Sequence, residues 1–274
     1  MSQIMTKWIC TTLLMILCLS CEPAKDRQIS LFTFPKITDS RDIDYAERVT
    51  LSPDQLESVF PPFLGKFKFG ENIDLNRARR PISYQDDIIS EYIIEDDDSL
   101  HVNGLELYVD YETEVYFNRE YAYDSVLWEH YPVYFVNSTA TDKIFIAKDG
   151  YVFGIQEAAK QKDSWDWRAI ECSGFDFCGN GGWGLIIHPG EYAAMLMRKY
   201  EGTLKTDLRV RFQMGNSTFV SKKFRGTINP NQFKVREPSY PHLVMMDGQR
   251  EVPDWLFYGA KPDTSFQIRS VTTE

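Results

Sequence analysis

The residue types that carry most enzyme chemistry are present in this sequence but are not grouped. Its four histidines, His101, His130, His188 and His242, are widely separated, and no His-Glu-x-x-His zinc motif occurs. The sequence also lacks the Gly-x-Ser-x-Gly turn that exposes a nucleophilic serine at a strand end. We therefore predict no metal site, no cofactor and no catalytic constellation from sequence motifs.

Two polar runs have plainer explanations than ligand binding. The glycine-rich run at 179–184 lacks the Lys-Ser or Lys-Thr and the helix that complete a phosphate-binding loop, so we expect a turn. The acidic run at 95–98 lacks the alternate spacing and the glycine of a calcium loop, so we expect a solvated turn. Glycoside hydrolysis needs two carboxylates at a fixed separation, which spacing along the sequence does not supply.

Tryptophan gives the sharpest binding hypothesis. If residues 165–171 are extended, Trp165 and Trp167 lie on one side of a strand, and Trp183 follows close in the sequence. Exposed indole rings stack on sugar rings or anchor protein partners, so these three residues are a candidate binding surface. The alternative is that they fill the hydrophobic core, because aromatic side chains dominate core energetics.

The first twenty residues have the composition of an export signal. Lys7 supplies a positive charge, residues 8–19 are mostly apolar, and the small residue Ser20 precedes Cys21. The apolar run is shorter than the roughly 20 residues that a membrane-spanning helix needs. The segment Leu17-Cys18-Leu19-Ser20-Cys21 resembles the lipobox of bacterial lipoproteins.

This resemblance implies cleavage before Cys21 and lipid attachment to its sulfur and its new amino terminus. The protein would then be anchored in the cell envelope, at the periplasmic or the surface-exposed face of the outer membrane. Plain cleavage of the signal peptide and a membrane-spanning helix are the alternatives. The lipid makes the membrane the first predicted partner.

Cysteine counting follows from the same resemblance. Cys10 and Cys18 would leave with the signal peptide, so only Cys172 and Cys178 would remain besides the lipidated residue. In an exported chain such a pair favours a disulfide, which here would close a short loop. Two reduced, buried cysteines are the alternative, because cysteine packs well as a small hydrophobic residue.

Acidic residues outnumber basic ones, with 40 Asp and Glu against 30 Lys and Arg and a formal net charge of −10. The basic residues are scattered and do not form the patch that binding to a phosphate backbone requires. We therefore predict no nucleic-acid partner. The acidic balance also gives no attraction to anionic head groups, so the lipid must hold the protein at the membrane.

Hydrophobic periodicity predicts a mainly β protein. It is clearest at 206–213, where Leu208, Val210 and Phe212 alternate with polar residues. Turn residues at 149–150, 189–190 and 215–216 separate short strands, a pattern typical of an antiparallel sandwich or barrel. The other predicted strands are 105–109, 115–117, 131–136, 143–147, 151–156, 166–172, 184–188, 191–197 and 219–228.

The same patterns divide the chain into five parts. They are a signal peptide (1–20), a lipidated tether with a short helix at 53–60 (21–73), a small β-rich segment (74–124), a β-sandwich (125–235) and a Pro-rich C-terminal extension (236–274). The helix is suggested by Ser52 as a cap and Pro53 in the first turn. In the extension, residues 255–258 form an apolar group that we expect to dock on the sandwich.

Three motifs carry a fold-level resemblance. They are Tyr-Pro-Val-Tyr-Phe-Val-Asn-Ser-Thr at 131–139, Ile-His-Pro-Gly-Glu-Tyr at 187–192 and the alternating strand at 205–212. Their order resembles that of immunoglobulin-like or fibronectin-like sandwich domains of bacterial surface lipoproteins. The resemblance covers residues 125–235 and implies an antiparallel immunoglobulin-like β-sandwich, with no particular substrate.

These observations predict a lipid-anchored envelope protein that acts as a non-catalytic binding or assembly module. Its expected partners are the membrane and an envelope protein or a glycan. The alternative is a glycan-binding protein or a hydrolase that acts on envelope or external polysaccharide.

Overall fold

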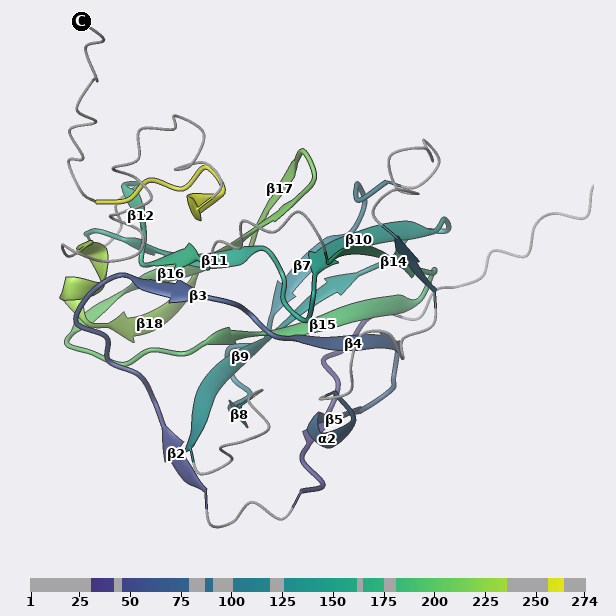
Figure 1. Ribbon diagram of the computed structural model, residues 1–274, viewed down its shortest axis with the longest axis horizontal. Helices are drawn as coiled ribbons and strands as arrows, with labels where there is room; N and C mark the ends of the chain where they lie inside the picture. The colour runs from purple at the N-terminus through teal and green to yellow at the C-terminus, as the bar shows by residue number, and fades with distance from the viewer. Residues whose placement is uncertain are drawn as a thin grey trace, which may run out of the picture. The chain divides into compact units, whose positions relative to one another are not determined.

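The computed structural model describes residues 31–41, 46–78, 87–90, 101–118, 126–161, 165–174, 181–235 and 256–263, and these residues are mainly β-structure, as predicted (Figure 1). The strands are β1 (Ile37–Thr38), β2 (Glu47–Val49), β3 (Glu57–Val59), β4 (Phe63–Lys68), β5 (Ile73–Asp74), β6 (Ile88–Ser90), β7 (Glu106–Val109), β8 (Val115–Phe117), β9 (Val126–Val136), β10 (Lys143–Lys148), β11 (Gly154–Ala159), β12 (Trp167–Ala169), β13 (Glu171–Ser173), β14 (Gly182–Ile187), β15 (Glu191–Arg198), β16 (Leu204–Met214), β17 (Ser217–Val220) and β18 (Phe224–Ile228). The short helices are α2 (Leu75–Ala78) and the 3-10 helix η2 (Pro230–Phe233). Within the described ranges, no helix is long and apolar enough to cross a membrane.

The larger sheet is built around β9 and β15. These strands pair antiparallel from Tyr192 opposite Val136 to Arg198 opposite His130, and β4 pairs with the other edge of β15. The strand order is β2-β9-β15-β4, with β7 and β8 also paired to β9. The predicted strands at 131–136 and 191–197 are thus the centre of this sheet.

The second sheet is built around β16. Its strand order is β12-β11-β16-β17, and β18 also pairs with β16. The alternation predicted for 206–213 is confirmed, because Leu208, Val210 and Phe212 are almost fully buried while Arg209 and Arg211 are only half-buried. A smaller sheet of order β10-β14-β6 contains the strands predicted at 143–147 and 184–188.

The sheets are mixed, which differs from the antiparallel arrangement that we expected. Three pairs are parallel, namely β1 with β5, β3 with β13, and β2 with β9. Each includes a strand from the N-terminal part of the chain, before residue 60. Such a pair joins segments that are distant in sequence and needs no hairpin turn, so turn residues do not reveal it.

The main hydrophobic cluster joins one face of the larger sheet to the second sheet. Val133 and Phe135 of β9 share this cluster with Val210 and Phe212 of β16. The rings of Phe135 and Phe212 meet edge to face, with their centroids 5.2 Å apart. Gly154 leaves room for this packing, because a Cβ there would lie 2.3 Å from the Phe212 ring.

N-terminal residues cover the opposite face of the larger sheet. The ring of Phe32 lies 5.6 Å from that of Tyr134 and 5.3 Å from that of Tyr192, measured between centroids. Ile37 and Ile73 belong to the same hydrophobic cluster. Residues 31–41 and 46–73 are therefore part of the folded unit, whereas the sequence had assigned 21–73 to a tether.

The prediction of a short helix at 53–60 is wrong. Residues 57–59 form β3 instead, paired in parallel with β13 so that Glu57 lies opposite Glu171. Val59 becomes 4% exposed in this position. The burial gained by strand pairing outweighs the local capping signal of Ser52 and Pro53, because helix propensity is a weak preference.

The C-terminal apolar group docks as expected. Leu256, Phe257 and Tyr258 are buried in a cluster that also contains Ile155 and Cys172. Trp255, which we grouped with them, lies outside the described residues. This docking brings Tyr258 next to the ends of strands from the second sheet, where a pocket is found.

Candidate functional site

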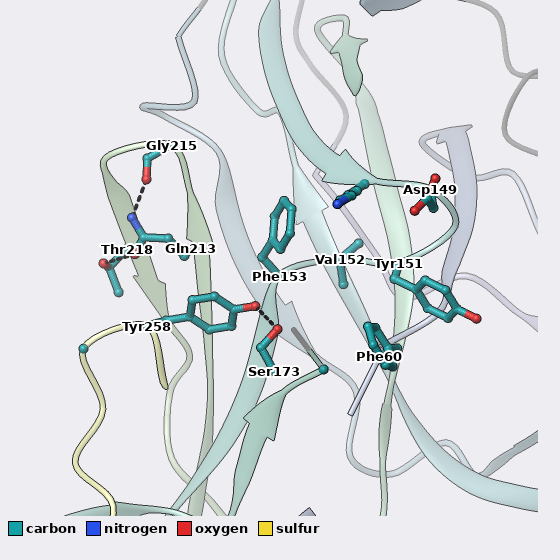
Figure 2. Close-up of a pocket in the computed structure, with 13 residues that line it drawn as sticks. Phe60, Asp149, Tyr151, Val152, Phe153, Ser173, Gln213, Gly215, Thr218 and Tyr258 are labelled. Atoms are coloured by element: carbon teal, nitrogen blue, oxygen red, sulfur yellow. Dashed lines mark hydrogen bonds between the residues drawn. The ribbon is translucent and has the colours of Figure 1, made fainter. Parts of the chain in front are cut away.

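A pocket of about 860 Å³ lies where the β10–β11 turn, the β16–β17 hairpin, the end of β13 and the C-terminal segment meet. Its volume is in the range of small-molecule sites. The residues that line it are Phe60, Lys148, Asp149, Tyr151, Val152, Phe153, Ser173, Gly174, Gln213, Gly215, Thr218, Tyr258 and Gly259. Figure 2 shows Phe60 and Tyr151 on one side, Gln213, Thr218 and Tyr258 on the other, and Phe153 between them.

Four aromatic side chains give the pocket its apolar surface. The rings of Phe60 and Tyr151 lie 5.1 Å apart between centroids, at an angle of 49°. Phe60 is 48% exposed although it is a large hydrophobic residue. Its ring lies directly on Gly174, where a Cβ would be only 2.1 Å from it. Glycine at position 174 therefore fixes where this wall of the pocket stands.

Polar groups of the pocket are held in place by one another. The Tyr258 hydroxyl donates a hydrogen bond of 2.6 Å to Ser173 Oγ, and Thr218 Oγ1 donates one of 2.7 Å to Gln213 Oε1. The Gln213 amide donates in turn to the carbonyl of Gly215 (Figure 2). Burial raises the pKa of Tyr258, so its hydroxyl is protonated at neutral pH. These bonds fix the donors and acceptors before any ligand arrives.

Asp149 sits at the β10–β11 turn with a φ of 50°. Its backbone N–H donates to the carbonyl of Gly181 (2.8 Å), and its own carbonyl accepts from Trp183 Nε1 (2.8 Å). A Cβ on Gly181 would lie 2.3 Å from Asp149 Oδ1, so this close approach requires glycine. Trp183, which we predicted at a binding surface, is instead 5% exposed and supports the turn from the core.

The other two predicted tryptophans are on β12 or next to it. Trp165 is 94% exposed just before the strand. The ring of Trp167 is half-buried, with the guanidinium carbon of Arg209 4.2 Å from its centroid. Arg209 in turn forms an ion pair with Glu157, with its Nε 2.8 Å from Glu157 Oε2. The structure therefore does not bring Trp165, Trp167 and Trp183 together on one surface, and none of them lines the pocket.

Cys172 is fully buried on β13, and its thiol forms no disulfide within the described residues. Burial raises its pKa to about 12, so the sulfur is protonated at neutral pH and is a poor nucleophile. Cys178 and Cys21 lie outside the described residues, as does the acidic run at 95–98. The disulfide between Cys172 and Cys178 and the lipid on Cys21 stay predictions.

A second cavity, of about 480 Å³, shares Phe60 and Tyr151 with the pocket. The larger sheet contributes Trp128 and His130 of β9 and Arg198 at the end of β15. The full lining is Ser58, Val59, Phe60, Pro61, Pro62, Phe117, Asn118, Val126, Trp128, His130, Tyr151, Glu171, Leu196, Met197 and Arg198. The two cavities therefore adjoin each other at the Phe60 and Tyr151 rings.

Glu171 is the most unusual ionisable group of this second cavity. Its carboxyl accepts hydrogen bonds from the Gln156 backbone (2.7 Å), from the Gln156 amide (2.8 Å) and from the Tyr200 hydroxyl (2.6 Å). Burial raises its pKa to about 7, against the opposing effect of these three donors. Such a carboxyl exchanges a proton near neutral pH, but all three of its hydrogen-bond partners are protein groups.

The described histidines form no metal site. Burial, with the charge of Arg198 as a smaller cause, lowers the pKa of His130 to about 3, so this ring is neutral. His188 lies at the β14–β15 turn, with Nδ1 2.8 Å from Asp142 and Nε2 3.4 Å from Asp87. The hydrogen bond to Asp142 raises its pKa. Across the described part of the chain, no three His, Cys, Asp or Glu side chains are arranged to hold a metal ion.

Sequence reasoning missed the pocket because five separate segments build it. The turns at 149–150 and 215–216 and the apolar group at 255–258 were singled out, but none of them for ligand binding. Phe60 and Phe153 carry no local signal, since each is an apolar residue beside a strand. Proline and glycine around residues 60–65 mark a turn but do not show which side chains face a cavity.

Comparison of the chain with protein families, with curated proteins and with solved structures finds no match. The candidate site is therefore interpreted from its own geometry.

Proposed function

We propose that this chain is a lipid-anchored protein of the bacterial cell envelope and acts as a non-catalytic binding module, with the 860 Å³ pocket as its binding site. The export-signal composition of residues 1–20 and the lipobox-like Leu17–Cys21 support the anchor. We also propose that the domain is an immunoglobulin-like β-sandwich, supported by the motif order at 131–212 and by the shared core of the two larger sheets.

The observation that carries the binding proposal is the composition of the pocket. Four aromatic rings share its wall with five polar side chains that can donate or accept hydrogen bonds, namely Lys148, Asp149, Ser173, Gln213 and Thr218. A saccharide has this combination of surfaces, because each sugar ring presents C–H faces that stack on aromatic rings and hydroxyls that need donors and acceptors. The pocket thus fits a saccharide ligand better than a purely apolar one.

Binding is tested with the full chain in detergent micelles on an array of oligosaccharides, followed by titration of the best ligand. Phe60→Ala removes the stacking wall, so the affinity should fall at least about tenfold, or ~1.4 kcal/mol. Trp165→Ala is the matched control, because it removes a larger exposed ring outside the pocket and should leave the affinity unchanged. An array on which nothing binds, or affinity that survives Phe60→Ala, contradicts the proposal.

Glu171 favours a second candidate function, hydrolysis of a polysaccharide. A carboxyl with a pKa near 7 beside a cavity meets one requirement of a general acid. Glu57, opposite Glu171 on the parallel strand, is a candidate for the second carboxylate, and burial raises its pKa as well. This function predicts release of new reducing ends, lost in Glu171→Gln. Binding without turnover assigns the chain to the first function.

A further inference from the structure

We propose that the second cavity binds a carboxylate of the ligand at Arg198, so that the protein selects acidic saccharides over neutral ones. This inference rests on the proposed saccharide pocket. Because Phe60 and Tyr151 line both cavities, a sugar unit stacked in the main pocket adjoins the space that Arg198 faces.

Arg198 has unused binding capacity. Its side chain lies at the end of β15, with the guanidinium carbon 5.8 Å from the centre of the Trp128 ring. Its backbone is fixed, since its carbonyl accepts a hydrogen bond of 2.6 Å from the Gln156 amide. Within the described ranges the guanidinium forms no ion pair. The five N–H donors of arginine form a planar fork that matches a carboxylate.

The two described carboxyls near Arg198, Glu57 and Glu171, do not take this role. Glu171 and Glu57 are both close enough for the charge of Arg198 to oppose the rise in their pKa. Neither is within ion-pair distance of it, and Glu171 accepts its three hydrogen bonds from Gln156 and Tyr200. An external carboxylate is therefore the partner that the guanidinium lacks.

The charges of the residues that line the cavity favour a single carboxylate over a phosphate. Arg198 is the only lysine or arginine among the lining residues, and His130 is neutral. A phosphate dianion normally recruits more than one positive charge, whereas the lining of this cavity supplies one. The formal net charge of the whole chain is −10, so general electrostatic attraction does not favour anions. In this cavity, a preference for an acidic ligand must therefore arise locally at Arg198.

The test compares methyl β-glucoside with methyl β-glucuronide, which differ only by a carboxylate in place of the C6 alcohol. Their affinities for the full chain in detergent micelles are measured by ligand-observed NMR. The glucuronide should bind at least tenfold more tightly, and Arg198→Gln should abolish this preference without weakening glucoside binding. Arg198→Lys should restore it in part, because an ammonium keeps the charge but not the fork.

Arg225→Gln is the matched control. It removes the same charge from a side chain that is 53% exposed and paired with Asp207, on β18 and outside both cavities. The preference should survive in this variant, and thermal unfolding of each variant checks that it is folded. If Arg198→Gln is unfolded, the Arg198→Lys result decides.

The outcomes separate the two proposals. Equal affinities in the wild type, or a preference that survives Arg198→Gln, overturn the carboxylate site and leave the saccharide pocket standing. Glucuronide binding that depends on Arg198 but not on Phe60, with no binding of the glucoside, overturns the pocket and leaves the carboxylate site standing. Binding of neither glycoside overturns both.

Discussion

Glu171 should make the folded protein less stable as the pH rises, which is the reverse of the usual behaviour of a carboxylate. An ionised Asp or Glu normally gains favourable partners on folding, and its folded pKa falls. The Glu171 side chain has no exposed surface, and burial raises its pKa from the ordinary 4.5 to about 7. Between these pH values the folded state holds a proton that the unfolded state has released, so the free energy of unfolding falls with rising pH.

The magnitude follows from this interval. Each pH unit within it changes the free energy of unfolding by about 1.4 kcal/mol, so the carboxyl costs about 3 kcal/mol by pH 7. His130 acts in the opposite direction, because its pKa of about 3 means that the unfolded state binds the extra proton below pH 6.5. The two effects largely cancel in the wild type between pH 4.5 and 6.5. The difference between wild type and Glu171→Gln isolates the carboxyl.

Urea unfolding at a series of pH values from 4.5 to 8 measures this difference. In the wild type, one carboxyl oxygen of Glu171 accepts the Gln156 backbone N–H. Glu171→Gln replaces this oxygen by an amide nitrogen, and the lost hydrogen bond lowers the free energy of unfolding by about 1–3 kcal/mol at every pH. At pH 4.5 the variant should therefore be no more stable than the wild type. Between pH 4.5 and pH 7, its free energy of unfolding should rise by about 3 kcal/mol relative to that of the wild type.

The matched control is Glu112→Gln, an exposed residue of the β7–β8 connection, for which the difference should be flat over the same pH range. A difference that is also flat for Glu171→Gln would refute the reasoning, because it would mean that the buried carboxyl is charged at no cost. A difference that grows in favour of the wild type with rising pH would refute it as well.

Three further substitutions test the packing around the two cavities. Gly154→Ala forces a methyl group into the Phe212 ring and should lower the free energy of unfolding by about 1–3 kcal/mol in urea titrations; an unchanged midpoint would contradict this packing. Gly174→Ala should displace the half-exposed Phe60 ring and reduce saccharide affinity about tenfold with a smaller loss of stability than Gly154→Ala, and the reverse order of losses would count against the proposed wall. Trp183→Phe loses one partly buried hydrogen bond to the β10–β11 turn and should cost about 1 kcal/mol in thermal unfolding, whereas no loss would mean that the bond does not support the turn.

Sequence predicted the strands of this protein well where the signal was local. The strand at 206–213 was identified because apolar and polar residues alternate along it, and Leu208 and Val210 are buried as expected. The parallel strands β1, β2 and β3 were not identified. Each has two or three residues, and each is stabilised by a partner far along the chain, so neither periodicity nor turn residues mark it.

Tryptophan shows why the site was harder to predict than the fold. Trp165 and Trp183 are the same residue type, yet one is 94% and the other 5% exposed. Their difference depends on where each indole falls relative to the packed sheets, which spacing along the chain does not specify. The pocket itself depends on loops and strand ends such as Phe60 and Tyr258, which are 198 positions apart in the numbering and meet only in the folded chain.

Because Phe60 and Tyr151 line both cavities, we expect occupation of one cavity to change the affinity of the other. A ligand that orders these two rings in the main pocket also orders them for the neighbouring cavity. A second ligand that binds there then loses less conformational entropy. Such linkage is reciprocal, and an anion at Arg198 would tighten the main pocket by the same factor. The main pocket and the cavity at Arg198, each of which binds weakly alone, would then bind tightly only a ligand that fills both.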